Sequence, residues 1–287
     1  MNEKKLLRKL LSHRIREFSE IDNTCIALKN ASEHDIAYFE IDTRVSKDDK
    51  IYVYHDSVFK QRGIKFKIRD KNASYIDGLI QNKKIVLDTL DDFLSCYKEY
   101  ISNASKLVVD IKDFGAEEKH LELIRKYDLV DKVVFVTWIP HTIRKLHEIA
   151  PEIPIILAYI PLNKLGGIGS LIAYALRNST LNFGEIVLLG ENKINAPLGE
   201  YKKGFQHAIV TTEVSEDLIK ILKKSKGGVC IERLQINDKI LSTHRKQGLE
   251  IWIFGITTFK GFLKYAGKSL IDVVFCDVAY TVIKKLK

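Results

Sequence analysis

The chain has 287 residues, of which 46% are hydrophobic and 29% charged, with 16 glycines and 5 prolines. These proportions are those of an ordinary globular protein and argue against collagen-like, low-complexity or largely disordered chains. The 46 lysines and arginines against 37 aspartates and glutamates give a formal net charge of +9, which favours an anionic partner such as nucleic acid, a membrane surface or a phosphorylated small molecule.

Short apolar, β-rich segments alternate along the chain with longer segments of helical periodicity, which is typical of repeated βα units. The expected strands, in chain order, are Leu10–His13, Ala37–Val45, Ile51–His55, Lys106–Ile111, Val133–Trp138, Ile155–Ile160, Val229–Leu234, Ile251–Ile256 and Val273–Asp277. The expected helices include Thr24–Glu33, Leu90–Tyr100, Ala116–Tyr127, Thr142–Ile149, Ser215–Lys224 and Asp238–Gln247. Ile51–His55 follows the second strand after a short turn and is expected to be its hairpin partner. Eight strands remain, which predicts a single-domain (β/α)8 TIM barrel spanning residues 1–287.

Two stretches exceed what a barrel of this kind needs, one after the second strand and one after the fifth. Phe59–Ile85 is expected to be a basic loop, since it contains Lys60, Arg62, Lys65, Lys67, Arg69 and Lys71. Leu162–Gln206 contains the turn Gly166-Gly167-Ile168-Gly169, which matches neither of the common nucleotide-binding glycine motifs. Both stretches are therefore predicted to be insertions within one domain.

Cysteine usage and hydropathy predict the environment of the protein. The cysteines Cys25, Cys96, Cys230 and Cys276 are widely separated and form no CxxC pair, so we expect buried thiols and a reducing, cytoplasmic location. No apolar run approaches the ~20 residues of a membrane span. The first residues also lack the unbroken apolar segment of a signal peptide.

Acidic and basic side chains gather near the ends of the first barrel strands. Glu40 and Asp42 are two residues apart and therefore point to the same side of their strand, and Asp110 and Lys112 repeat this spacing one barrel strand later. Because a barrel collects its catalytic groups at the carboxyl ends of its strands, one mouth is expected to hold them. The predicted site comprises His13, Arg14, Glu40, Asp42, His55, Asp110 and Lys112.

The types of these residues indicate a chemistry. Three carboxylates form an oxygen-only ligand set, which suits Mg²⁺, Ca²⁺ or Mn²⁺ better than zinc. Two histidines beside such a cation, with an arginine and a lysine, are typical of proton transfer around a phosphate. Each pattern alone also has a structural explanation: strand carboxylates form salt bridges, and Asp22-Asn23-Thr24 is best explained as a helix N-cap cluster.

The order of the motifs resembles that of the glycerophosphodiester phosphodiesterase family, whose members are TIM barrels. The matching segments are His13-Arg14, Asp22-Asn23-Thr24, Glu40-Ile41-Asp42, His55-Asp56 and Asp110-Ile111-Lys112. They are similar to the family's HRG, ENT, ExD, HD and ExK motifs, in that order. Ile251–Phe254 and Phe275–Asp277 resemble its seventh and eighth strands, so the likeness spans almost the whole chain.

The resemblance implies a role for each matching residue. A divalent cation, Mg²⁺ or Ca²⁺ with Mn²⁺ as a further candidate, would be held by Glu40, Asp42 and Asp110. His13 and His55 would be the catalytic acid and base, Arg14 and Lys112 would neutralise the phosphate, and Trp252 would wall the alcohol end of the substrate. The implied reaction is metal-dependent hydrolysis of a glycerophosphodiester, or a related small phosphodiester, to a phosphomonoester such as glycerol 3-phosphate plus an alcohol.

The sequence departs from the family pattern at several positions. Ile15 replaces the glycine after His-Arg, and a β-branched residue does not readily adopt the positive φ that glycine allows. Asp22 and Asp110 are one methylene shorter than the family glutamates, and Gly255-Ile256 replaces a threonine-valine-asparagine ending. These departures leave a second hypothesis open, a catalytically impaired phosphate-binding barrel that acts as a binding partner.

A third hypothesis concerns the basic stretch from Lys60 to Lys71, which is also compatible with binding nucleic acid or an anionic membrane. The stretch has no repeated aromatic platform and no nucleic-acid-binding motif. A solvated loop near the active mouth, with no specific nucleic-acid partner, is therefore the preferred interpretation. The sequence makes no prediction of oligomeric state.

Overall fold

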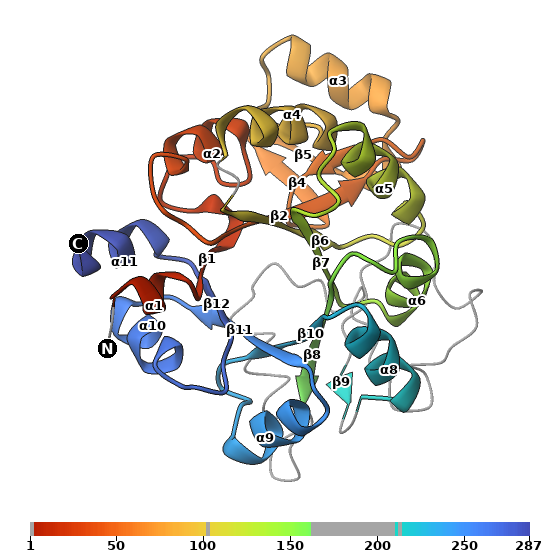
Figure 1. Cartoon of the computed structure of the whole chain (residues 1–287). Helices are drawn as coiled ribbons and strands as arrows, with labels where there is room; N and C mark the ends of the chain where they lie inside the picture. Colours follow the sequence, from red (N-terminus) through yellow and green to blue (C-terminus); the bar gives the residue numbers. More distant parts are fainter. Residues whose placement is uncertain (1–2, 102–103, 162–209, 212–213) are drawn as a thin grey trace.

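The computed structural model describes residues 3–101, 104–161, 210–211 and 214–287, so the expected insertion Leu162–Gln206 lies outside the described residues. Its centre is a closed barrel of eight parallel strands (Figure 1). Around the barrel these are β1 (Leu10–Ser12), β2 (Tyr38–Val45), β6 (Lys106–Ile111), β7 (Val133–Thr137), β8 (Ile155–Pro161), β10 (Gly228–Glu232), β11 (Glu250–Ile256) and β12 (Val273–Cys276). β1 pairs with both β2 and β12, which closes the sheet. The predicted (β/α)8 barrel is confirmed.

The predicted strands all correspond to observed ones, and their ends differ by at most two residues. β1 ends at Ser12 and β3 (Ile51–Val53) ends two residues before His55, so both predicted catalytic histidines lie in the turns after their strands. β3 runs antiparallel to β2, with Ile51 opposite Val45, as predicted. The short strand β9 (Val210–Thr211) pairs with the end of β8.

Alternate residues of each barrel strand point into the barrel, and the others pack under the surrounding helices. In β6, Leu107 and Val109 belong to the core beneath the helices, whereas Val108 belongs to a separate core inside the barrel. The inner core comprises Leu11, Val108, Val134, Val136, Trp138, Ile156, Ala158, Cys230, Trp252, Val273 and Phe275. The barrel is therefore filled with side chains and has room for polar groups only near its rim.

Helices surround the barrel and cover its outer face (Figure 1). They are α1 (Glu3–Leu7), α2 (Cys25–Ala31), α4 (Leu90–Tyr100), α5 (Glu117–Lys126), α6 (Pro140–Ile149), α8 (Glu216–Lys224), α9 (Asp238–Lys246), α10 (Phe259–Ala266) and α11 (Ala279–Leu286). Thr24, Thr89, Asn237 and Thr258 each cap a helix by accepting a hydrogen bond from the backbone N–H three residues later. Among the described residues, no helix has both the length and the apolar character needed to cross a membrane.

The basic stretch after β3 is folded, so the expectation of a loop was wrong. β4 (Val58–Gln61) and β5 (Ile64–Lys67) form an antiparallel hairpin, which is followed by a 3-10 turn (Ile68–Asp70) and α3 (Ala73–Gln81). Phe59 and Phe66 lie opposite each other on the inner face of the hairpin and stack at 5.0 Å between ring centroids. They form a small core of their own with Tyr52, Ile68, Ile76, Ile85 and Leu87. Each of these strands has only four residues, and most of their side chains are polar. The alternation of apolar and polar residues was therefore too short to predict a hairpin.

The expectation of four buried thiols was also wrong. Cys25 at the start of α2 and Cys96 in α4 are joined by a disulfide, and neither is fully buried. Cys230 and Cys276 are free and buried, as predicted. Residues 71 positions apart pair here because α2 packs against α4, a contact that cysteine spacing does not reveal. The predicted cytoplasmic location rested partly on reduced thiols and loses that support.

Candidate functional site

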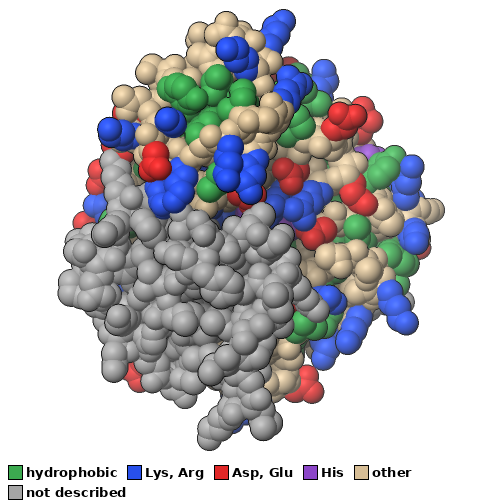
Figure 2. Space-filling view, turned by 180° about the vertical axis from the view of Figure 1, so that it is seen from behind, with side chains coloured by type: hydrophobic (Ala, Val, Ile, Leu, Met, Phe, Trp, Pro, Cys, Tyr) green, Lys and Arg blue, Asp and Glu red, His purple; other side chains and the backbone are tan. Residues whose placement is uncertain are grey.

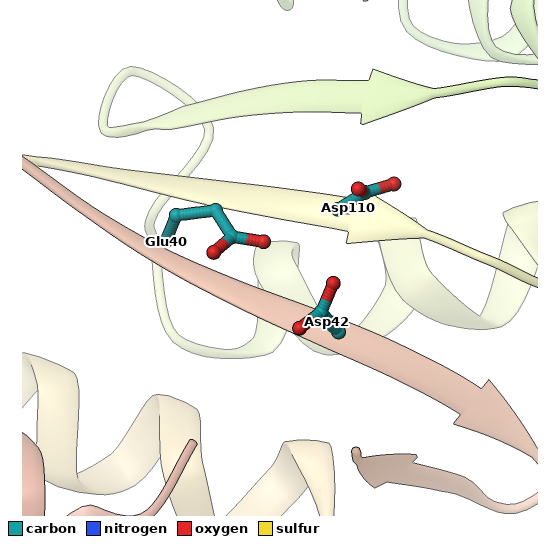
Figure 3. Close-up of side chains that lie close together, drawn as sticks. All are labelled: Glu40, Asp42 and Asp110. Carbon is teal, nitrogen blue, oxygen red and sulfur yellow. The ribbon is translucent and has the colours of Figure 1, made fainter. Parts of the chain in front are cut away.

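Three buried carboxylates meet between β2 and β6 toward the carboxyl end of the barrel. Glu40 and Asp42 lie on β2, and Asp110 on β6 is the register partner of Asp42. Figure 3 shows Glu40 and Asp42 on β2 and Asp110 on the neighbouring β6. One oxygen of each lies within 4.8 Å of the others, and none of the three residues is more than 5% exposed. The sequence prediction that these acids come together is therefore confirmed.

The carboxylates lack the hydrogen-bond partners that buried acids usually have. Glu40 Oε1 and Asp110 Oδ1 accept a hydrogen bond from no described residue, and Asp42 Oδ1 is met only by the ion-pair contact with Lys112. Burial and then the neighbouring Asp42 raise the pKa of Glu40, and burial raises the pKa of Asp110 to about 6. A hard divalent cation such as Mg²⁺ or Ca²⁺ would supply the missing partner, so the residues fit such an ion.

Lys112 and Arg14 lie against these carboxylates. Lys112 Nζ is 2.5 Å from Asp110 Oδ2 and 3.0 Å from Asp42 Oδ1, and this lysine is 5% exposed. Arg14 Nε lies 3.4 Å from Asp42 Oδ2, while the Arg14 backbone N–H donates to Glu40 Oε2 at 2.8 Å. Burial opposes ionisation of Asp42, but the charges of Lys112 and Arg14 outweigh it and hold its pKa well below the usual range. Asp42 is therefore the permanently ionised member of the cluster.

His13 is held by an acid from the opposite end of the chain. Its Nδ1 lies 2.5 Å from Asp277 Oδ1, just after β12, and its Nε2 lies 3.9 Å from Glu40 Oε2. Arg16 Nη1 also bonds Asp277 Oδ1, at 2.9 Å. The ring is therefore fixed at Nδ1, and its Nε2 points toward the carboxylate cluster.

His55 is held in a similar way by its neighbour in sequence. His55 Nδ1 lies 2.7 Å from Asp56 Oδ1, and the guanidinium of Arg44 donates to the His55 carbonyl at 2.6 and 2.9 Å. Arg44 is itself fixed by a buried ion pair with Asp113 at 2.9 Å. Asp56 therefore fixes the ring of His55, and Arg44 of β2 fixes its backbone.

Both histidines favour the neutral form. Burial lowers the pKa of His13, although the bond to Asp277 opposes the change. Burial lowers the pKa of His55 to about 3, with Arg14 and Lys112 adding to the effect and Asp42 opposing it. In contrast, the His13 ring holds the pKa of Asp277 at about 2 against the effect of burial. Two neutral imidazoles with carboxylates at Nδ1 are arranged for general base work at Nε2.

The turn that carries His13 and Arg14 has an unusual backbone. Arg14 and Ile15 have φ of 56° and 53°, in the left-handed region. Ile15 therefore adopts the positive φ that its β-branched side chain disfavours, and its side chain is fully buried in the main core. Burial of the isoleucine offsets the backbone strain and keeps the Arg14 N–H aimed at Glu40.

Trp252 does not line the mouth, so its predicted substrate contact was wrong. The residue is 1% exposed, and its Nε1 donates to Glu250 Oε2 at the start of β11. Its ring packs against Tyr38 at the start of β2. Phe254, two residues later on the same side of β11, is the aromatic residue nearer the mouth, and it packs edge-on against Trp138 at 5.6 Å.

Sequence reasoning missed two residues of the site. Thr24 caps α2 as predicted, but the preceding Asn23 donates its amide N–H to Asp42 Oδ2 at 2.9 Å and is 2% exposed. Asp277 pairs with His13 across 264 positions of sequence. Both residues could have been found in the sequence, because Asn23 adjoins the capping Thr24 and Asp277 follows the last strand. Asn23 was overlooked because its segment was interpreted only as a helix cap.

Comparison with known sequences identifies relatives of the chain. The model of the glycerophosphoryl diester phosphodiesterase family matches residues 11–161. An uncharacterized protein of Mycoplasma genitalium is 25% identical over 163 residues, which are 52% of this chain and 65% of that protein. The uncharacterized YqiK protein of Bacillus subtilis is 26% identical over 157 residues, 51% of this chain and 65% of YqiK. The chain thus matches slightly less than two thirds of the length of these relatives.

Solved structures resemble the chain over nearly its whole length. A phosphodiesterase of Oleispira antarctica, in complex with the product sn-glycerol-3-phosphate, has a TM-score of 0.64 at 14% identity and covers 100% of this chain and 99% of its own. Glycerophosphodiester phosphodiesterases of Parabacteroides distasonis and Thermotoga maritima have TM-scores of 0.64 and 0.61 at 14% and 19% identity, covering 97% and 96% of this chain and 96% and 97% of their own. At such low identity these structures show that the fold is shared.

Proposed function

Because the chain belongs to the glycerophosphoryl diester phosphodiesterase family, we propose that it is a metal-dependent phosphodiesterase. The proposed substrate is a glycerophosphodiester or a related small phosphodiester, which would be cleaved to a phosphomonoester such as glycerol 3-phosphate and an alcohol. The observation that carries the proposal is the buried cluster of Glu40, Asp42 and Asp110, with an unpartnered oxygen on Glu40 and on Asp110, beside two carboxylate-held histidines.

The three carboxylates are the proposed ligands of the divalent cation, which is Mg²⁺ or Ca²⁺. When bound there, the cation supplies positive charge that offsets the negative charge of the phosphoryl oxygens. Lys112 now lies against both Asp42 and Asp110 and offsets their negative charge. A bound cation would offset that charge in place of Lys112. Lys112 and Arg14 would then be available to bind phosphate oxygens.

The proton transfers are assigned to His13 and His55. One neutral imidazole would take a proton at Nε2 from the attacking hydroxyl, which in the family is a neighbouring glycerol hydroxyl in many members or else water. The other would act as an imidazolium, a form that the negative charge of a bound phosphodiester favours, and would donate its Nε2 proton to the departing alkoxide. Attack by the glycerol hydroxyl gives a cyclic phosphate, which water then opens to the phosphomonoester. In that second step the histidine that lost its proton takes one from the water, and the histidine that gained a proton returns it to the released glycerol oxygen. Asp277 and Asp56 would stabilise whichever imidazolium forms, because each carboxylate already lies against Nδ1.

The experiment is hydrolysis of glycerophosphodiesters by the full chain with Mg²⁺, with Ca²⁺ and with a chelator. We expect activity that depends on the cation and falls by at least about 10²-fold in His13→Ala and His55→Ala. His147→Ala, on α6 and outside the carboxylate cluster, is the matched control and should retain activity. Unchanged activity in either catalytic variant, or full activity with chelator, would contradict the proposal.

The second candidate function, a phosphate-binding barrel with impaired turnover, is favoured by one observation. The Asp110 side chain is one methylene shorter than the family glutamate, and Lys112 Nζ, 2.5 Å away, already offsets its negative charge. On this hypothesis glycerol 3-phosphate binds, and no cation among Mg²⁺, Ca²⁺ and Mn²⁺ gives hydrolysis. Product binding measured by calorimetry, combined with the activity assay, separates the two functions.

A further inference from the structure

Most of the chain's excess positive charge lies in one folded insertion. Residues 58–86, which comprise the β4–β5 hairpin, α3 and the segment that follows it, contain eight basic and two acidic residues, a net +6 of the chain's +9. The basic residues are Lys60, Arg62, Lys65, Lys67, Arg69, Lys71, Lys83 and Lys84, and the acidic ones are Asp70 and Asp77. The insertion is packed around its own core, so this charge is held on a fixed surface.

The outer face of the hairpin places like charges directly opposite each other. Lys60 on β4 is the cross-strand partner of Lys65 on β5, and both are exposed, while Phe59 and Phe66 fill the inner face. Opposed like charges destabilise a hairpin. Among the described residues, neither lysine has an acidic group within ion-pair distance. An external anionic surface would remove this repulsion.

In the same insertion, α3 leaves apolar side chains in contact with solvent. Ile76 is the buried member of the helix, Tyr75 is 46% exposed, and Leu79 and Ile80 are half-buried. Lys71 Nζ lies over the Tyr75 ring, 4.9 Å from its centroid. In Figure 2, hydrophobic side chains at the top of the molecule, where α3 lies, have lysines and arginines around them.

The insertion is anchored to the same strands that carry the site. The hairpin starts three residues after His55, the Lys47 N–H donates to the Lys71 carbonyl at 2.9 Å, and the Ala73 N–H donates to Asp48 Oδ1 at 2.8 Å. Both contacts come from the turn between β2 and β3. A surface that bound the insertion would therefore be held at a fixed position relative to the barrel mouth.

We propose that the insertion docks the protein on an anionic phospholipid surface. Apolar and aromatic side chains among lysines are the pattern of a helix in the interfacial layer of a membrane, where the apolar groups enter the acyl boundary and the lysines contact headgroups. Nucleic acid fits less well, because the hairpin phenylalanines are buried against each other and are not available to stack on bases.

The test is sedimentation of the full chain with vesicles of phosphatidylcholine, alone or with phosphatidylglycerol at about one lipid in three. We expect binding only to the vesicles that contain phosphatidylglycerol, with an affinity that decreases as salt increases. Lys60→Gln combined with Lys65→Gln should weaken binding by about 25-fold, since each charge contributes about fivefold. This variant relieves the cross-strand repulsion, so loss of folding does not explain a weaker affinity.

The matched control is Lys239→Gln combined with Lys246→Gln, which removes two exposed lysines from α9 on the opposite side of the barrel (Figure 1). It should bind vesicles like the unchanged protein. Equal binding to both vesicle types, equal loss in the two double variants, or tighter binding to duplex DNA than to anionic vesicles would overturn the proposal. Vesicle binding is measured without substrate, so its outcome is independent of phosphodiesterase activity.

Discussion

Two aspartates of the site have opposite tendencies to ionise because their neighbours differ. Asp277 lies against His13 and Arg16, and its pKa is held at about 2 even though it is largely buried. For Asp110 burial outweighs the bond to Lys112, and its pKa is raised to about 6. The first is suited to stabilising an imidazolium, and the second to binding a cation that displaces its proton.

Asp277→Asn tests whether the acid positions His13. Asp277 raises the pKa of His13 against burial, so its loss should lower that pKa further. We expect kcat to fall by about 10²-fold and the acidic limb of the pH profile to move to lower pH. Asp22→Asn is the control, because Asp22 bonds Arg16 without contacting His13. A simple rise in KM with an unchanged pH profile would contradict a positioning role for Asp277.

Ile15 allows the backbone strain of the turn that carries His13 and Arg14 to be measured. Replacement by alanine removes buried volume and keeps the strained φ of 53°, and should destabilise the protein by about 2–4 kcal/mol. Replacement by glycine removes slightly more volume but relieves about 1–2 kcal/mol of strain. We therefore expect the two variants to have similar free energies of unfolding in urea.

Ile36 provides the comparison for this experiment, because it is equally buried in the same core and has no positive φ. There the glycine variant should be about 1–2 kcal/mol less stable than the alanine variant. If the glycine variant of Ile15 were also about 1–2 kcal/mol less stable than the alanine variant, the turn would not be strained.

At the scale of elements, those that face the main core were predictable and those with a separate small core were not. Barrel strands such as β7 and β8 are nearly continuous apolar runs because both of their faces are buried, and several of the helices begin with a capping residue such as Thr89. In the insertion, Phe59 and Phe66 are the buried residues of the hairpin, and their neighbours in sequence are mostly lysines. So few apolar residues do not give a clear strand pattern. The Cys25–Cys96 bond was missed because it depends on α2 packing against α4, which is a tertiary contact.

The disulfide between α2 and α4 should stabilise the fold. It closes a loop with a sequence separation of 71 residues, and loss of such a link costs about 2–4 kcal/mol. We expect a reducing agent to lower the Tm of the unchanged protein and to leave the Tm of Cys25→Ser combined with Cys96→Ser unchanged. Thiol titration of the denatured, unreduced protein should find only Cys230 and Cys276 reactive. Four reactive thiols would contradict the pairing.

At the scale of the whole molecule, closure of the barrel decides which residues meet. The sequence was sufficient to predict that Glu40, Asp42 and Asp110 converge, because their spacing and strand order place them on adjacent strands. It was insufficient for His13 and Asp277, which meet only because β1 pairs with β12. It also misplaced Trp252, which shares a side of β11 with Phe254 but is buried low in the barrel, where its Nε1 bonds Glu250 at the start of the strand.

The cation should link the site to the stability of the whole barrel in a pH-dependent way. An acid with a raised folded-state pKa binds its proton more tightly when folded, so without a cation the contribution of Asp110 is greatest below about pH 4 and declines as pH rises through about 6. A cation that binds only the ionised site reverses this loss, and at 100 times its Kd it would stabilise the fold by about 2.7 kcal/mol. Below pH 6 protons compete, and the affinity should fall about tenfold per pH unit.

We therefore expect Mg²⁺ or Ca²⁺ to raise the Tm clearly at about pH 7.5 and by roughly half as much at about pH 5, as measured by calorimetry at one cation concentration. Asp110→Asn should lose the increment at both pH values, because an amide supplies no charge to the cation. Asp56→Asn is the matched control, since its carboxylate holds His55 and lies outside the ligand cluster. An increment that is equal at the two pH values, or that survives in Asp110→Asn, would place the cation elsewhere on the protein.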